Sequence, residues 1–183
     1  MYYSQIYVPV KLILSKYWLN NYEYICIIIH INVIERGVIM ESVKEIRELV
    51  NLQDWKDAYY VVRQLRTDLE EETYLSSIEE MTNQGYKLFG MYDQDRVIAI
   101  AGVNQLKNLV YDKYIWVQDL VTDSGHRSKG YGHELLSYIH NWAREREYKV
   151  IALSSGVQRS EAHRFYQVQM GYKLTSYVFM NKL

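Results

Sequence analysis

The sequence predicts a mixed α/β domain of the α+β type, in which about four helices flank a mixed sheet of about seven strands. Its length of 183 residues is that of one ordinary domain, which can bury a core without a disulfide or a metal. Hydrophobic residues make up 49% and charged residues 23%, a composition that excludes wholesale disorder. Along residues 40–183 the apolar pattern predicts the order strand, two helices, three strands, helix, strand, helix and two strands.

Charge and cysteine content exclude several classes of protein. The formal net charge is −1, from 21 basic and 22 acidic residues, so no basic field indicates a nucleic-acid partner. Cys26 is the only cysteine, which excludes an intramolecular disulfide and cysteine-cluster metal sites and fits a reducing cytoplasm. The longest apolar run, 25–29, is far too short to span a bilayer, and we expect neither a membrane partner nor a metal.

Residues 1–39 form an atypical N-terminal extension in front of the domain at 40–183. They contain nine Ile and six Tyr but no Ala, Asp, Thr or Phe. We expect this segment to result from a start codon placed too early, with Met40 as the natural start. The alternative is a genuine β-rich extension that packs on the domain or on a second subunit, as in a homodimer.

The first part of the domain reads as one strand and two helices. A modest alternation over 42–50 favours a strand. Asp54 can cap a helix over 55–66, in which apolar side chains recur on one face. A second helix is expected over 68–83, and Gly85 fits the exit of that helix.

Three strands are predicted next. Two of them, over 86–92 and 96–103, are joined by a short polar segment typical of a hairpin. A loop that contains Asn104 and Asn108 then leads to a long apolar strand over 111–122.

The last part of the domain begins with a helix whose residues Leu135, Ile139 and Trp142 share one apolar face. The elements predicted after it are a buried strand over 149–153, a helix over 160–169 capped by Ser160 and closed by Gly171, and final strands over 172–174 and 177–183.

The polar, glycine-rich loop 123–132 is the most informative stretch. Gly130 and Gly132 leave space for a ligand to approach backbone N–H groups, and the helix that follows directs its positive dipole end at the same point. Such an arrangement binds a pyrophosphate, and the side chains of His126, Arg127 and Lys129 add positive charge. An ordinary left-handed turn with solvated basic side chains is the alternative. Leu135 stands where a dinucleotide fingerprint would need its third glycine.

The segment Arg127-Ser128-Lys129-Gly130-Tyr131-Gly132 resembles the Arg/Gln-x-x-Gly-x-Gly/Ala signature of the GNAT superfamily of acetyl-CoA-dependent N-acetyltransferases. A second motif of that family is matched by 153–156, by Ala162-His163-Arg164-Phe165-Tyr166 and by Gly171-Tyr172, although Arg159 stands where Asn is frequent. The resemblance implies a mostly antiparallel, twisted sheet and acetyl-CoA as co-substrate. The residues it assigns to coenzyme binding are Leu120, Val121, Thr122, Arg127, Ser128, Lys129, Gly130, Tyr131, Gly132 and Phe165.

The same resemblance implies that an amine nitrogen attacks the acetyl thioester directly. Tyr166 resembles the general acid of the family, and the alternative is a core tyrosine bonded to the backbone. Asp119, in an apolar strand, is a candidate general base, and it could equally order a loop or bind the cation of the substrate. His126 and His163 are lesser candidates for the base. Ser154 and Ser155 fit polar strand-end residues better than nucleophiles.

The acceptor is a small-molecule or peptide amine that the sequence does not define further. The second helix carries acids and no base, which would attract a cationic amine or simply form a solvated face; these acids are Asp68, Glu70, Glu71, Glu72, Glu79 and Glu80. A non-catalytic acyl-CoA-binding regulatory module with the same fold is the main alternative function. A nucleotide-phosphate enzyme is disfavoured because no acidic metal ligands stand at helpful spacing.

Overall fold

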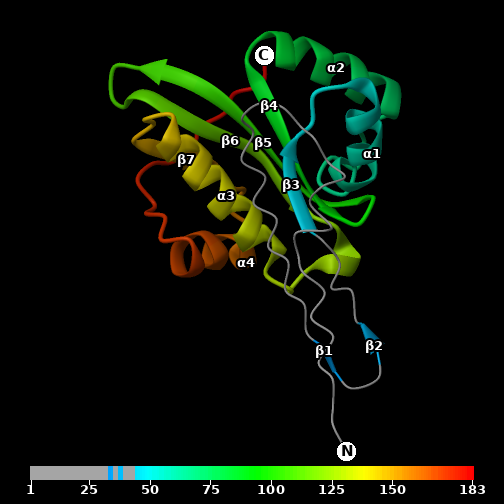
Figure 1. Ribbon diagram of the computed structural model, residues 1–183. Coiled ribbons are helices and arrows are strands. Elements are labelled where there is room, and N and C mark those ends of the chain that lie inside the picture. Colours follow the sequence, from blue (N-terminus) through cyan, green and yellow to red (C-terminus); the bar gives the residue numbers. More distant parts are fainter. Residues whose placement is uncertain (1–32, 35–36, 39–43) are drawn as a thin grey trace, which may run out of the picture.

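The computed structural model describes residues 33–34, 37–38 and 44–183 (Figure 1). A short antiparallel pair joins β1 (Val33–Ile34) to β2 (Gly37–Val38). The main sheet has the order β3-β4-β5-β6-β7, and its strands are β3 (Lys44–Glu48), β4 (Tyr86–Asp93), β5 (Arg96–Asn108), β6 (Asp112–Thr122) and β7 (Val150–Leu153). All neighbours in this sheet are antiparallel except β6 and β7, which are parallel. The predicted mixed, mostly antiparallel sheet is therefore confirmed, with five strands in place of seven.

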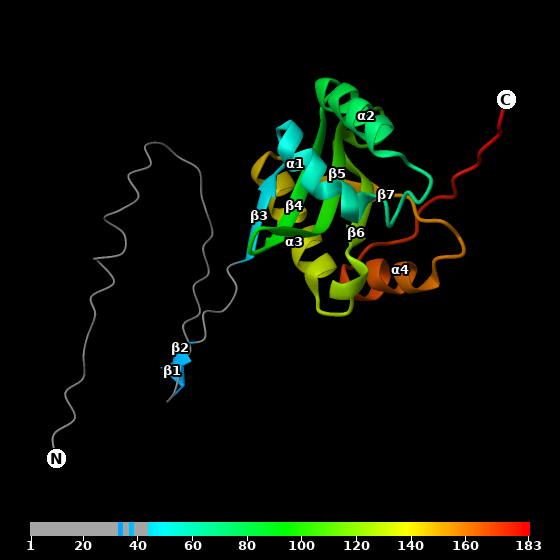
Figure 2. The same cartoon turned by 90° about the vertical axis from the view of Figure 1, so that its right-hand side faces the viewer.

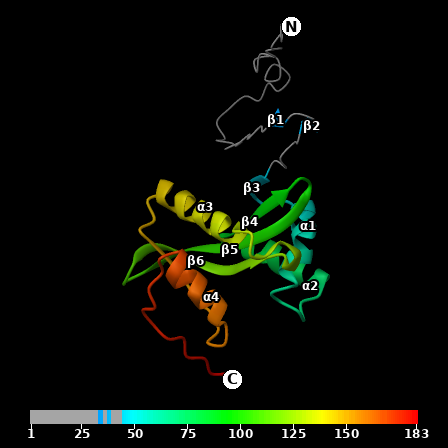
Figure 3. The same cartoon turned by 90° about the horizontal axis from the view of Figure 1, so that it is seen from below.

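Helices cover both faces of the sheet, as Figure 3 shows. One face carries α1 (Leu52–Val62) and α2 (Glu71–Asn83), and the other carries α3 (Tyr131–Glu145) and α4 (Ser160–Arg164). The central strand β5 is buried on both sides because its side chains alternate between two apolar clusters. Ile98 packs with the cluster under α3, while Ile100 packs with the cluster under α1 and α2.

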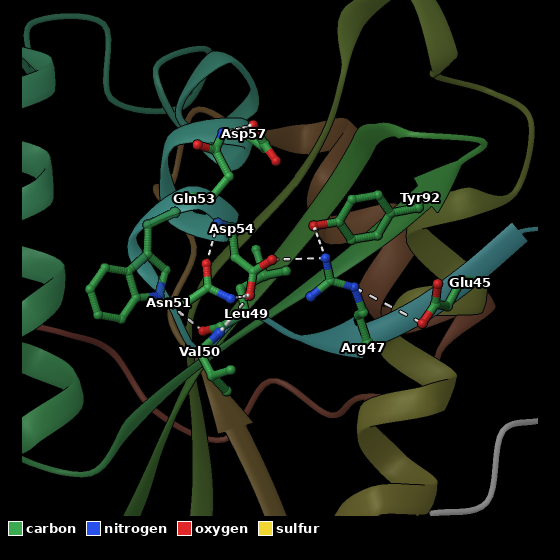
Figure 4. A network of polar contacts seen from close by, with 10 residues as sticks. Glu45, Arg47, Leu49, Val50, Asn51, Gln53, Asp54, Asp57 and Tyr92 are labelled. Carbon is green, nitrogen blue, oxygen red and sulfur yellow. Dashed lines mark hydrogen bonds and ion pairs between the residues drawn. The ribbon is translucent and has the colours of Figure 1, made fainter. Parts of the chain in front are cut away.

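The start of α1 differs from the prediction that Asp54 caps it. Asn51 is the N-cap, and its side-chain oxygen accepts a hydrogen bond from the Asp54 backbone N–H at 3.0 Å. Asp54 lies inside the first turn, where its carboxylate accepts the Val50 N–H at 3.1 Å. Arg47 lies 2.8 Å from the buried Asp54 carboxylate, whose charge it compensates, and also donates to the Tyr92 hydroxyl (Figure 4).

The other helices follow the predicted positions. Gly85 adopts the left-handed conformation, with φ of +94°, directly after α2. The helix expected over 160–169 is present, but Ser160 is its first residue and Arg159 holds the cap position, where no side-chain hydrogen bond forms within the described part of the chain. Its second half is a π-helical turn, Phe165–Gln169, in which the Met170 N–H donates to the Phe165 carbonyl at 3.1 Å.

The loop expected around Asn104 and Asn108 is instead part of β5. Antiparallel pairing continues to Asn108 opposite Asp112, so β5 and β6 project as a two-stranded ribbon. The outer part of this ribbon is exposed, so that polar side chains such as that of Gln105 remain in contact with water.

The two final strands are also absent: after Gln169 the described chain has no further strand. The Tyr172 N–H donates to the Tyr166 carbonyl at 2.9 Å, which ties this segment to the preceding helical turn instead of to a sheet edge. Beyond it the chain leaves the domain (Figure 2), and Phe179 is 92% exposed. The apolar alternation is therefore present in the sequence, but no neighbouring strand hydrogen-bonds to it among the described residues.

The predictions for residues 1–39 lie almost wholly outside the described residues. Within the described parts of the chain, no helix is both long and apolar enough to cross a bilayer.

Candidate active site

Strands β6 and β7, the last two strands of the sheet, separate part of the way along β6. Their parallel pairing begins with Tyr114 opposite Val150 and ends with Val117 opposite Leu153, whereas β6 continues to Thr122. On that side, residues 118–122 have no strand partner within the described chain. The backbone of β6 therefore presents an open edge just beyond the point where the two strands diverge.

A β-bulge at Gln118 determines which side chains face each side of this opening. Val117 pairs with Val103 and Asp119 with Gly102, so Gln118 is the extra residue. Val117 and Leu120 pack with the cluster under α3, while Val121 packs with the cluster under α1 and α2. Asp119 lies between Leu120 and the bulge, and its contacts with Arg66 and Tyr86 place its side chain on the α1–α2 side.

The glycine-rich loop closes one end of the opening. It runs through a short 3₁₀ turn, Ser124–His126, and reaches Gly130, whose φ of +87° is in the left-handed region. Helix α3 starts at the next residue, and among the described residues no side chain caps it. A Cβ atom on Gly132 would lie 3.4 Å from Thr122 Oγ1 and 3.9 Å from the Phe165 ring, so β6, α3 and the π-helical turn meet at this glycine.

Two basic side chains of the loop bind the loop itself. Arg127 Nε donates to the Thr122 carbonyl at 3.2 Å, and Lys129 Nζ donates to the Gly125 carbonyl at 3.4 Å. Arg127, Ser128 and Lys129 are all exposed, and Tyr131 is half-buried with the Lys44 ammonium 4.6 Å from its ring centre. Arg127 and Lys129 therefore lie just before the start of α3, and their contribution to coenzyme binding stays a prediction.

The loop is fixed by Asp123, a buried residue that the sequence reading did not single out. Its carboxylate accepts a 2.7 Å hydrogen bond from Gln64 and lies 2.6 Å from His126 Nδ1. Burial alone would raise the pKa of Asp123, but these two hydrogen bonds and the charge of Arg96 outweigh it and hold the pKa below its ordinary value. His126 therefore has a structural partner. A local sequence pattern cannot reveal this network, because it joins distant positions. The Gln64 side chain accepts a hydrogen bond from the backbone N–H of Ser124, which lies 60 residues later in the sequence.

Tyr166 lies on the α3–α4 side of the opening. Its ring packs against Phe165 at 5.2 Å and Tyr172 at 5.9 Å between centroids, and it shares a cluster with Leu120 of β6 and Leu153 of β7. No described residue hydrogen-bonds to its hydroxyl, so it is not a core tyrosine bonded to the backbone. Burial raises the pKa of Tyr166, although the charge of Arg159 opposes this, and the phenol is therefore protonated at neutral pH.

Asp119 lies on the opposite face of the sheet from Tyr166. Its Oδ1 is 2.7 Å from the Arg66 guanidinium, and its Oδ2 accepts the Tyr86 hydroxyl at 3.0 Å. The Asp119 side chain is 16% exposed and borders an open pocket of about 710 Å³ between the sheet and the two helices. Burial and the neighbouring carboxylate raise the pKa of Tyr86 well above its ordinary value, so this hydroxyl remains a donor to Asp119.

The remaining candidates have other surroundings. His163 Nε2 lies 3.0 Å from the Gly156 carbonyl and so binds the backbone. Ser154 is exposed, and the buried Ser155 hydroxyl has no partner among the described residues. Of the six acids in the α2 region, only Asp68 borders the pocket, and all six are solvent exposed. No group of three or more His, Cys, Asp or Glu within the described residues could hold a metal ion.

These features fit the coenzyme that the motifs imply. The start of α3, with its two glycines, offers backbone N–H groups to a diphosphate. A side chain at position 132 would narrow the space through which the diphosphate reaches these N–H groups. The open edge of β6 offers backbone groups to an extended chain that carries amides. Val121 can contribute only its backbone there, because its side chain packs on the α1–α2 side.

Comparison with known proteins agrees with this geometry. Residues 49–172 match the model of the family described as the acetyltransferase (GNAT) family. An uncharacterized N-acetyltransferase of Bacillus subtilis (strain 168), YhdJ, is 38% identical over 134 residues, which cover 73% of this chain and 94% of the relative.

Solved structures share the fold. The aminoglycoside N-acetyltransferase AAC(6')-Iy in complex with CoA superposes with a TM-score of 0.70 at 15% identity, over 82% of this chain and 99% of that protein. A transcriptional regulator from Bacillus halodurans C-125 superposes with a TM-score of 0.68 at 20% identity, over 76% of this chain and 99% of that protein. With the family match covering more than half of the sequence, the chain belongs to the acetyltransferase (GNAT) family of acetyl-CoA-dependent transferases.

Proposed function

We propose that the protein transfers the acetyl group of acetyl-CoA to a primary amine by direct attack in a ternary complex. The observation that carries this proposal is the position of Tyr166 and Asp119 on opposite faces of the sheet, at the point where β6 separates from β7. A proton donor and a proton acceptor thus flank one opening without competing for the same space.

The coenzyme supplies an acetyl thioester. We assign its diphosphate to the backbone N–H groups from Gly130 to Gly132, with Arg127 and Lys129 adding charge at the rim. Its extended arm is assigned to the open edge of Leu120, Val121 and Thr122, and Phe165 borders this region beside Gly132.

Three proton transfers balance the reaction. The acceptor ammonium gives one proton to Asp119, directly or through a water, and the freed nitrogen forms the new bond to the acetyl carbon. As the bond from that carbon to sulfur breaks, the Tyr166 phenol gives its proton to the departing thiolate, and the second proton of the attacking nitrogen returns through water to the Tyr166 phenolate. A thiolate with a pKa near 8.5 requires such a donor at neutral pH. The net products are the acetylated amine, free CoA and one proton, which Asp119 releases to solvent.

No cysteine relay is needed for this sequence of steps. Cys26 is the only thiol of the chain and lies outside the matched family region, 49–172. The relatives support the proposal, since one is described as an N-acetyltransferase and the structure of another was solved with CoA.

The test is release of free CoA from acetyl-CoA across a panel of primary amines, with coenzyme binding measured separately by calorimetry. We expect release that depends on an amine and yields one acetylated product for each CoA. Tight CoA binding without release from any amine would contradict transfer and leave a binding module. Absence of CoA binding would contradict the coenzyme site itself.

A further inference from the structure

The pocket beside Asp119 is predominantly apolar. It measures about 710 Å³ and lies between α1, α2 and the sheet. Its aliphatic lining comes from α1, from the connection between α1 and α2, from α2 and from the sheet: Val62, Leu65, Leu69, Ile78, Met81, Leu88 and Ile100. A volume of this size is in the range of small-molecule sites, about 300–1,000 Å³.

The charges around the pocket are few. Arg66, Asp68 and Asp119 are the ionised residues of the lining, which gives one positive and two negative charges. Of the two carboxylates, Asp119 is the less accessible, and it already receives a hydrogen bond from Tyr86. The five glutamates of the α2 region do not line the pocket, so they offer no second or third anchor to a polycation.

An ammonium ion that enters this pocket can pair with Asp119, the more buried of its two carboxylates, by replacing Arg66, whose side chain is 54% exposed and can turn towards solvent. The rest of the molecule then lies against aliphatic side chains, where each buried methylene is favourable and each unpaired hydroxyl is costly.

We infer that the acceptor is a small primary amine with a single positive charge and an apolar body. The inference rests on the proposed function, because it takes the pocket beside Asp119 as the acceptor site. It distinguishes this protein from a transferase for polyhydroxylated or polycationic amines.

A matched panel of acceptors tests the inference. 2-Phenylethylamine and 3-methylbutylamine represent apolar amines, 2-amino-1,3-propanediol a polar one, and kanamycin a polycation. We expect kcat/KM to be at least about tenfold higher for the apolar pair than for the other two. Preference for the diol or for kanamycin over both apolar amines would overturn the inference while leaving acetyl transfer intact. If no amine releases CoA, the proposed function fails, and this inference fails with it.

Two variants of α2 test the location of the site. Met81→Gln places a polar group of similar length in the pocket lining, whereas Leu75→Gln makes the same type of change on the same helix outside the lining. We expect KM for 2-phenylethylamine to rise about tenfold in Met81→Gln, with KM for acetyl-CoA unchanged and with little change in Leu75→Gln. Equal effects of the two variants, or an unchanged KM in Met81→Gln, would overturn the assignment of the pocket.

Discussion

The guanidinium of Arg66 lies 2.7 Å from Oδ1 of Asp119, so that a side chain from the connection between α1 and α2 pairs with a carboxylate on strand β6. The two residues are 53 positions apart in the sequence. Arg66 is 54% exposed, whereas Asp119 is only 16% exposed and also accepts the Tyr86 hydroxyl, so the guanidinium is the partner that can turn towards solvent. In the proposed reaction the acceptor ammonium competes with Arg66 for this oxygen.

The first prediction concerns that competition. Replacing Arg66 with Gln removes the competing cation and leaves Asp119 in place. Because an exposed ion pair contributes about 0.2–1 kcal/mol, we expect KM for the acceptor amine to fall about two- to fivefold, with KM for acetyl-CoA unchanged. Arg63→Gln is the control, since Arg63 is an exposed arginine at the end of α1 outside this pocket. A higher KM for the amine in Arg66→Gln would show that Arg66 binds the acceptor and does not compete with it.

The second prediction concerns the proton donor. Tyr166→Phe keeps the ring that packs against Phe165 and Tyr172 and removes only the hydroxyl, which no described residue binds. We expect kcat to fall about 100-fold or more, with the unfolding temperature and KM for acetyl-CoA nearly unchanged. Tyr177→Phe, in the exposed C-terminal segment, should behave as the parent protein. Full turnover by Tyr166→Phe would exclude the acid role.

Local patterns predicted the parts of the site that are contiguous in sequence. The glycine loop and the start of α3 lie together within 123–132, and the segment around Phe165 and Tyr166 is helical as expected. Both are determined by neighbouring residues, through backbone conformation and helix periodicity. The side-chain network of Asp119, Arg66 and Tyr86 was not foreseen, because it joins three elements whose approach depends on how the helices pack on the sheet.

The errors at the ends of strands have a similar origin. Asn104 and Asn108 are polar and indicated a loop, but pairing with β6 extends β5 through both of them. The segment after Tyr172 has the apolar content of a strand and lacks a neighbouring strand to pair with among the described residues. A strand depends on its partner as well as on its own sequence, so the number of strands was less predictable than the number of helices.

The third prediction separates the two glycines of the loop. Gly130 needs its φ of +87°, so Gly130→Ala strains the turn, and we expect a loss of about 1 kcal/mol, or about 2–4 °C in Tm. In Gly132→Ala the added Cβ would lie 3.4 Å from Thr122 Oγ1 and 3.9 Å from the Phe165 ring, which are ordinary contact distances. Its Tm should therefore stay within about 1 °C of that of the parent protein. Its methyl group nevertheless obstructs the approach to the helix start, so KM for acetyl-CoA should rise about tenfold. Unchanged coenzyme binding in Gly132→Ala would contradict the assigned diphosphate site.

The fourth prediction concerns the acid sensitivity of folding. Burial acts to raise the pKa of Asp54, but hydrogen bonds from Arg47, Val50 and Asn51 and the charge of Arg47 outweigh it, so the pKa is lowered. A lowered carboxyl pKa stabilises the fold fully above the unfolded value, about 3.9, and the contribution is lost as pH falls through the folded value. Asp54→Asn removes the charge that Arg47 pairs with, and we expect it to cost about 2 kcal/mol near pH 7, or about 4–8 °C in Tm.

The cost of Asp54→Asn should therefore shrink as the pH falls below about 4, because the parent protein loses the same interaction when Asp54 is protonated. Asp57→Asn provides the control, since Asp57 is an exposed carboxylate on the same helix whose contact is a 2.7 Å hydrogen bond from Gln53. Thermal unfolding of the three proteins between pH 3 and pH 8 measures the effect. A cost of Asp54→Asn that stays constant over that range would mean that the side chain stabilises α1 through shape and neutral hydrogen bonds, and that its pairing with Arg47 contributes nothing to the free energy of unfolding.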